Sequence, residues 1–273
     1  MRPLPPKLLL IALVAVFACC PPVSMVDVGP LPPQEPVAWL AVAHRGSLHS
    51  GKPDNSLSAL RETMAAGVTF LEVDVRRSSE GELFLFHDGS LQRSNSHAPR
   101  ALRGRRVQEL SRAERSEVSL GGSEHIPTLA EALDVVQGRP ATLQLDFKGE
   151  SDEPVLQALE LAESRHQRQQ VLIQLRTYTR VPTVLARYPG TRLLVRVRSM
   201  EELNAALAYP IEFVELERWV TPEAIHVAHA RGVKVLANVS GTRLDEKSTW
   251  DYFRTRGIDT VMTNHADQAL AFP

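Results

Sequence analysis

The chain has 273 residues, a formal net charge of −1 and 43% hydrophobic residues. This composition is that of an ordinary globular protein, and the near-neutral charge gives no electrostatic reason to expect nucleic acid as a partner. Its two cysteines, Cys19 and Cys20, both lie near the N-terminus. No disulfide can therefore support the rest of the chain, which must be stabilised by the burial of a core.

The first 20 residues have the pattern of a secretory signal. Arg2 and Lys7 precede an apolar run over residues 8–18, which is shorter than the roughly 20 residues needed to span a bilayer. The run ends at Ala18 and Cys19, like a bacterial lipoprotein signal, and we predict a lipid on Cys19. Ordinary signal cleavage and an uncleaved anchor are the alternatives. The expected location is the bacterial cell envelope, either as a membrane-anchored lipoprotein or as a periplasmic or secreted protein.

Residues 21–36 are rich in proline and lack helical or strand periodicity, which is typical of a semi-extended tether. We expect one folded domain over residues 37–273, where short apolar runs alternate with amphipathic segments. Several of the runs barely alternate with polar residues, as is typical of strands covered on both faces. The runs are residues 39–43, 68–75, 141–145, 171–175, 192–197, 211–216, 233–239 and 260–262. Helices are predicted between them at residues 56–66, 129–136, 154–163, 200–208 and 221–231.

This alternation of strands and helices favours a TIM-type (β/α)8 barrel. A doubly wound open sheet is the alternative, but no glycine-rich phosphate loop follows the first strand. Residues 83–86 are predicted to form an extra strand, and a polar, arginine-rich segment follows over residues 90–125. We therefore predict a small insertion after the second strand, at about residues 77–125, over the barrel mouth.

Polar residues cluster at the ends of these predicted strands, where TIM barrels carry their active sites. Glu72 and Asp74 are two apart, so they face the same side of a strand. Asp146 follows the next barrel strand. Burying three carboxylates without a cation would be costly. Ligation by oxygen alone indicates one divalent cation, either Ca²⁺ or Mg²⁺.

Two histidines and a guanidinium accompany these carboxylates. His44 and Arg45 follow the first strand, and His87 follows the extra strand. The two histidines can supply a general base and a general acid. The cation and Arg45 can neutralise phosphate charge, so the combination suits cleavage of a phosphodiester.

Ordered motifs along the chain resemble those of the glycerophosphodiester phosphodiesterase family. They are His44-Arg45-Gly46, Pro53-Asp54-Asn55, Glu72-Val73-Asp74, His87-Asp88, Ile126-Pro127-Thr128-Leu129 and Leu145-Asp146-Phe147-Lys148. The resemblance covers essentially everything after the tether. It implies a TIM barrel with a small insertion, a divalent cation, and hydrolysis of glycerophosphodiesters to sn-glycerol 3-phosphate and an alcohol.

The resemblance also implies a role for each site residue. It makes His44 and His87 the acid-base pair, Arg45 and Lys148 the phosphate-binding cations, and Glu72, Asp74 and Asp146 the metal ligands. In the implied mechanism one histidine deprotonates the neighbouring glycerol hydroxyl, which attacks phosphorus. The other histidine protonates the leaving alcohol, and water then opens the cyclic phosphate.

Three positions depart from the family pattern. The third metal ligand is usually glutamate rather than Asp146. Ala237 stands where the family often has tryptophan, which predicts an open pocket wall and a flat substrate profile. Asn264 stands where the family favours aspartate. Asn55 precedes a predicted helix, so we expect it either to cap that helix or to help position His44.

Two alternative functions remain open. A lysophospholipase D or a phospholipase acting on lipid-bearing phosphodiesters would share this fold. A catalytically silent phosphodiester-binding module is the alternative from another class, although binding alone would not require an acid-base pair. The expected partners are a small-molecule phosphodiester and a membrane, reached through the lipid on Cys19.

Overall fold

The computed structural model describes residues 39–92, 96–216 and 220–271. The predicted signal, the tether and Cys19 lie outside the described residues. No helix within the described ranges is long and apolar enough to cross a membrane.

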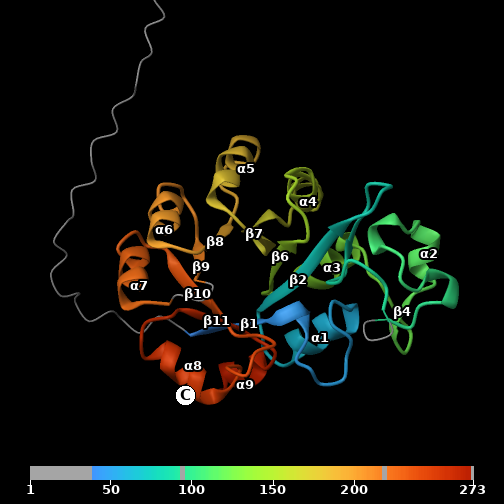
Figure 1. The fold of residues 1–273 in the computed structure, drawn as a ribbon, viewed down its shortest axis with the longest axis horizontal. Coiled ribbons are helices and arrows are strands. Elements are labelled where there is room, and N and C mark those ends of the chain that lie inside the picture. The colour runs from blue at the N-terminus through green and yellow to red at the C-terminus, as the bar shows by residue number, and fades with distance from the viewer. Residues whose placement is uncertain (1–38, 93–95, 217–219, 272–273) are drawn as a thin grey trace, which may run out of the picture. The chain divides into compact units, whose positions relative to one another are not determined.

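The described chain forms a closed ring of eight parallel strands (Figure 1). In ring order they are β1 (Leu40–Ala43), β2 (Phe70–Arg77), β6 (Thr142–Phe147), β7 (Val171–Leu175), β8 (Leu193–Val197), β9 (Phe213–Leu216), β10 (Lys234–Asn238) and β11 (Thr260–Thr263). Strand β11 pairs with β1, and β1 pairs with β2, which closes the ring. The predicted TIM barrel is therefore confirmed, and each predicted run coincides with one barrel strand to within two residues.

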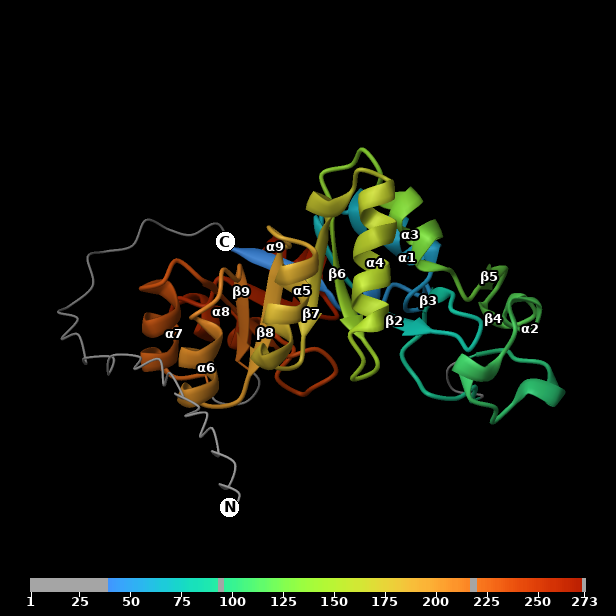
Figure 2. The same ribbon diagram turned by 90° about the horizontal axis from the view of Figure 1, so that it is seen from above.

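Helices lie around the outside of this ring (Figures 1 and 2). They are α1 (Leu57–Ala65), α3 (Leu129–Val136), α4 (Glu153–Ser164), α5 (Val181–Arg187), α6 (Met200–Ala206), α7 (Pro222–His229), α8 (Lys247–Arg254) and α9 (Ala266–Leu270). Hydroxyl side chains cap the N-termini of several of these helices. Thr128 and Glu131 form a capping box at α3, and Thr221 accepts a hydrogen bond from the backbone of α7.

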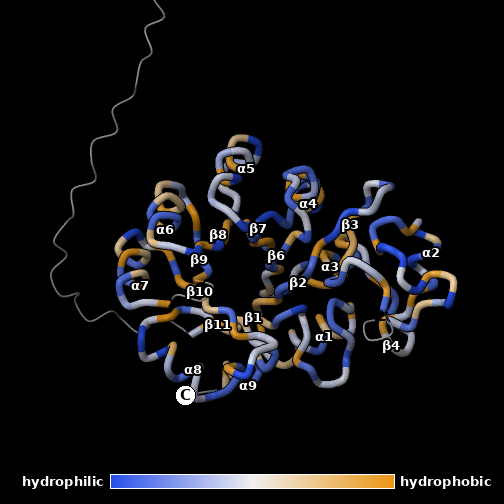
Figure 3. Tube along the Cα trace, in the orientation of Figure 1, coloured by the Kyte–Doolittle hydropathy of each residue, from blue (hydrophilic) through white to orange (hydrophobic). Residues whose placement is uncertain are grey.

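The strands are buried on both faces, which explains their continuous apolar runs. Apolar side chains such as Leu172, Leu194 and Phe213 pack together in one cluster inside the barrel. The alternate residues pack against the surrounding helices in a larger core. Figure 3 shows apolar residues along many of the strands, whereas the surrounding helices carry both apolar and polar residues.

The segment between β2 and α3 is the predicted insertion. Strand β3 (Leu83–Leu85) pairs antiparallel with β2, and α2 (Arg112–Ser116), β4 (Ser119–Gly121) and β5 (Glu124–His125) follow. A separate apolar cluster includes Phe84, Leu91 and Leu110. Arg115 is buried beside this cluster. Its guanidinium pairs with Glu82 and lies 4.9 Å from the centre of the Phe84 ring.

Candidate active site

A cavity of about 400 Å³ lies at the carboxyl ends of the barrel strands. Among its lining residues are all of the predicted site residues except Cys19, namely His44, Arg45, Glu72, Asp74, His87, Asp146 and Lys148. Parallel strands end on the same side of a barrel, so residues that are far apart in the sequence meet there.

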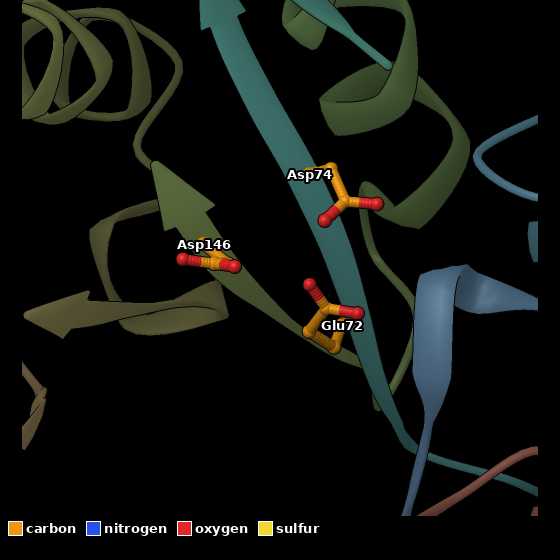
Figure 4. Close-up of side chains that lie close together, drawn as sticks. All are labelled: Glu72, Asp74 and Asp146. Carbon is orange, nitrogen blue, oxygen red and sulfur yellow. The ribbon is translucent and has the colours of Figure 1, made fainter. Parts of the chain in front are cut away.

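Three buried carboxylates form one wall of the cavity (Figure 4). Glu72 and Asp74 come from β2, and Asp146 lies on β6 in register with Asp74. Each residue offers one carboxylate oxygen, and these oxygens all lie within 4.8 Å of one another. The group is therefore compact enough for all three side chains to reach a single ion.

Backbone and amide groups orient the two carboxylates on β2. The backbone N–H of Arg45 donates to Glu72 Oε2 at 2.8 Å. The amide of Asn55 donates to Asp74 Oδ2 at 2.7 Å and accepts from the backbone N–H of Asp74 at 2.9 Å. The expectation that Asn55 caps α1 is wrong, because Ser56 accepts from the backbone of Ala59 instead. Asn55 orients a carboxylate, and its backbone N–H also donates to the carbonyl of Arg45 at 2.8 Å in the turn that contains His44.

Lys148 balances part of this negative charge. Its Nζ lies 2.6 Å from Asp74 Oδ1 and also donates to Asp146. Burial tends to raise the pKa of Asp74, but the hydrogen bonds and charge of Lys148, with Asn55, bring that pKa below its usual value. Glu72 has a pKa well above its usual value, because it is buried and lies beside Asp74 and Asp146.

This donor set fits a metal ion. Three carboxylates from two neighbouring strands provide hard oxygen ligands, which suit Ca²⁺ or Mg²⁺ rather than zinc. The buried Oδ1 atom of Asp146 has no hydrogen-bond partner among the described residues. The Arg176 guanidinium lies 3.7 Å from it. Glu72, Asp74 and Asp146 could therefore hold a cation.

His44 and Arg45 lie in a tight turn, η1 (His44–Gly46), that directly follows β1. Arg45 and Gly46 both have left-handed backbone conformations, with φ of 55° and 64°. A Cβ atom on Gly46 would lie 2.3 Å from a methyl carbon of Leu60, so only glycine fits there. His44 Nδ1 lies 2.8 Å from the side-chain oxygen of Asn264. Burial lowers the pKa of His44.

His87 lies at the rim of the cavity, just after β3. Its Nδ1 atom is 2.7 Å from Asp88 Oδ1. Arg76, at the end of β2, donates to the backbone carbonyls of Phe86 and His87 and so ties this segment to the barrel. His87 and Arg45 also line a second hollow, of about 300 Å³, which borders residues of the insertion. Arg45 and His87 therefore line both hollows.

The rest of the cavity lining contains polar residues that sequence reasoning missed. They are Gln174, Arg176, Arg196, Asn238 and Ser240. Behind them lies buried Glu215, which accepts hydrogen bonds from Gln174 at 2.9 Å and Arg196 at 3.2 Å. Burial raises the pKa of Glu215. In the sequence these residues could have been recognised only as single polar residues near the ends of apolar runs.

The expectation that Ala237 opens a wall of the pocket is wrong. Ala237 is buried in the layer between the strands and the helices. Its neighbour Asn238 faces the cavity instead, because successive residues of a strand point to opposite faces. The flat substrate profile inferred from Ala237 therefore loses its structural basis.

Comparisons with known proteins relate this chain to one family. The model of the glycerophosphoryl diester phosphodiesterase family matches residues 44–268. Glycerophosphodiester phosphodiesterase 1 of Mus musculus is 33% identical over 115 residues, which are 41% of this chain and 34% of that protein. The match therefore spans about a third of the mouse protein's length. "Probable glycerophosphodiester phosphodiesterase 2" of Mycobacterium tuberculosis is 25% identical over 84% of this chain and 88% of its own length.

Solved structures share the barrel. A glycerophosphoryl diester phosphodiesterase from Parabacteroides distasonis has a TM-score of 0.75 at 21% identity, covering 88% of this chain and 87% of its own. An Oleispira antarctica phosphodiesterase, solved in complex with the product sn-glycerol-3-phosphate, has a TM-score of 0.71 at 22% identity. That match covers 85% of this chain and 96% of the other. At these identities the likeness shows the fold.

Proposed function

The chain belongs to the glycerophosphoryl diester phosphodiesterase family, whose members are phosphoric diester hydrolases. We propose that it hydrolyses glycerophosphodiesters to sn-glycerol 3-phosphate and an alcohol. The observation that carries the proposal is the meeting of two histidines, three buried carboxylates and the cationic side chains of Arg45 and Lys148 around one cavity. The product named for the Oleispira antarctica phosphodiesterase agrees with this reaction.

His44 is the general base in this proposal. Burial lowers its pKa, so the imidazole is neutral at neutral pH. With its Nδ1 proton donated to Asn264, the ring keeps a lone pair on Nε2. This lone pair takes the proton of the glycerol hydroxyl next to the phosphate, and that oxygen forms a bond to phosphorus.

His87 is the general acid. Its Nδ1 faces the Asp88 carboxylate, which can pair with a charged imidazolium. As the bond between phosphorus and the alcohol oxygen breaks, His87 gives its proton to that oxygen. The histidines then exchange roles. His87 accepts a proton from water, whose oxygen attacks the cyclic phosphate, and His44 returns its proton to the glycerol oxygen.

Phosphate binding falls to the cationic side chains of the cavity. Arg45 lines both hollows, and Lys148 is held beside the triad by Asp74 and Asp146. We assign Ca²⁺ or Mg²⁺ to Glu72, Asp74 and Asp146. When bound, the ion would supply charge that neutralises the phosphoryl oxygens.

The experiment is turnover of glycerophosphocholine by purified residues 37–273. His44→Ala and His87→Ala should each lower kcat by about 10²–10⁴-fold, the usual contribution of general acid-base catalysis. His226→Ala is the matched control, because His226 lies on α7 and does not line the cavity. Near wild-type kcat in either folded active-site variant would reject the assignment. Binding without product release would favour a silent phosphodiester-binding module.

We also propose that the protein works at the bacterial cell envelope, attached through a lipid on Cys19. The short apolar run ending at Ala18 and the proline-rich residues after it support this location. A tether of that composition would hold the barrel away from a membrane surface.

A further inference from the structure

Asn264 makes the one side-chain hydrogen bond that His44 forms within the described residues. The Oδ1 atom of Asn264, at the end of β11, lies 2.8 Å from His44 Nδ1. A carbonyl oxygen has no proton to give, so His44 Nδ1 must be the donor. We propose that Asn264 is a positioning residue that fixes His44 in the tautomer with its proton on Nδ1 and, being uncharged, stabilises the imidazolium less than a carboxylate would. The inference rests on the proposed function, in which His44 is the base.

Asn264 is itself held in place by a group of contacts behind it. Its backbone N–H donates to Asp245 Oδ2 at 2.8 Å. The other oxygen of Asp245 accepts from the hydroxyl of Thr263 and from the indole N–H of Trp250, the latter at 3.3 Å. Trp250 is almost completely buried. These contacts hold the backbone of Asn264 in place and so orient its side chain toward His44.

The surroundings of His44 favour its neutral form. Burial disfavours the imidazolium, and the adjacent Arg45 on η1 adds to this effect. The hydrogen bond to Asn264 acts in the opposite direction, and so do the charges of Asp74 on β2 and Asp54 in the loop before α1. The side chain of Asn264, just after β11, carries no charge. Within the described residues His44 makes no ion pair, whereas His87 meets the Asp88 carboxylate at 2.7 Å.

An aspartate in place of Asn264 would change this balance. A carboxylate at hydrogen-bond distance would stabilise the imidazolium, and an opposite charge at such range typically shifts a pKa by about 1–3 units. His44 would then stay protonated, and inactive as a base, up to a higher pH. The asparagine therefore extends the working range of His44 to lower pH.

The test is the pH profile of kcat/KM with glycerophosphocholine, measured on the full chain for the wild type, Asn264→Asp and Asn264→Ala. Asn264→Asp keeps the accepting oxygen, so its plateau should stay within about tenfold of the wild type while its acidic limb moves up by about 1–3 pH units. Asn264→Ala removes the acceptor and should lower the plateau by more than about tenfold, within the 10²–10⁴-fold that a base contributes. Asn204→Asp, which places the same charge on the exposed side of α6, should leave the profile unchanged.

A second measurement does not depend on turnover. Nitrogen NMR of the wild-type enzyme should show His44 protonated on Nδ1 at neutral pH, and its titration midpoint should rise in Asn264→Asp. An unmoved acidic limb in Asn264→Asp, a wild-type profile in Asn264→Ala, or a proton found on Nε2 would each overturn the inference. Failure of the proposed function looks different, because the wild type itself would then leave glycerophosphocholine intact while the NMR result still decides the role of Asn264.

Discussion

Replacing Gly46 by alanine should destabilise the fold where it presents His44. The backbone at Gly46 has φ of +64°, and a non-glycine residue in that region costs roughly 1–2 kcal/mol. The new Cβ would lie 2.3 Å from a methyl carbon of the fully buried Leu60, and such overpacking typically costs about 1–3 kcal/mol. The sum is about 2–5 kcal/mol, a large fraction of the roughly 5–15 kcal/mol that stabilises a typical domain.

Gly232→Ala is the matched control. The φ of Gly232, +69°, is nearly the same as that of Gly46, but an added Cβ would meet nothing within 4 Å beyond its chain neighbours. The free energy of unfolding of Gly232→Ala should therefore fall only by the backbone strain of about 1–2 kcal/mol. Urea denaturation gives both free energies of unfolding from the transition midpoints. Kinetics add a second readout, because a displacement of about 1 Å at η1 can cost roughly 100-fold in rate. Gly232→Ala should keep its activity.

A double-mutant cycle with Leu60→Ala isolates the contact. Truncating Leu60 removes the methyl group that the new Cβ would meet, so Gly46→Ala should cost at least about 1 kcal/mol less in that background. Equal losses for Gly46→Ala and Gly232→Ala, or the absence of coupling to Leu60, would show that the turn relaxes freely and would refute the steric argument.

Three further predictions concern the metal, pH and the N-terminus. Dialysis against a chelator should abolish turnover until Ca²⁺ or Mg²⁺ is restored, and calorimetry should show weaker ion binding by Asp146→Ala; full activity of metal-stripped enzyme would contradict this. Because the base must be neutral and burial lowers the pKa of His44, the acidic limb of the kcat/KM profile should lie below the ordinary imidazole value of 6.5; an acidic limb above that value would argue against His44 as the base. Mass spectrometry of the native N-terminus should find a lipid on Cys19, and an unmodified terminus would count against the anchor.

The barrel could be predicted because strands buried on both faces need continuous apolar runs. Residues 171–175 are such a run, and they form β7 without a change of boundary. The site residues of β1, β2 and β6 could be placed as well, because carboxyl ends of parallel strands meet at one side of a barrel. Spacing alone put Glu72 and Asp74 on the same face.

The rest of the cavity lining could not be predicted in this way. Ala237 and Asn238 are neighbours in an apolar run, and a shift of one residue exchanges the side chains that face inward and outward. Only the register of β10 against β9 and β11 decides that Asn238 faces the cavity. Arg196 and Glu215 likewise read as isolated polar residues until their strands pair side by side.

By itself the sequence determined the kinds of element, their order and the residues able to perform acid-base and metal chemistry, since these depend on local composition and periodicity. Only the tertiary structure decided the partner of each group. Asn55 meets Asp74 rather than capping a helix, and His44 meets Asn264 across 220 residues of chain. Such contacts exist because β11 closes the ring against β1, and closure depends on the packing of the whole core rather than on any local pattern.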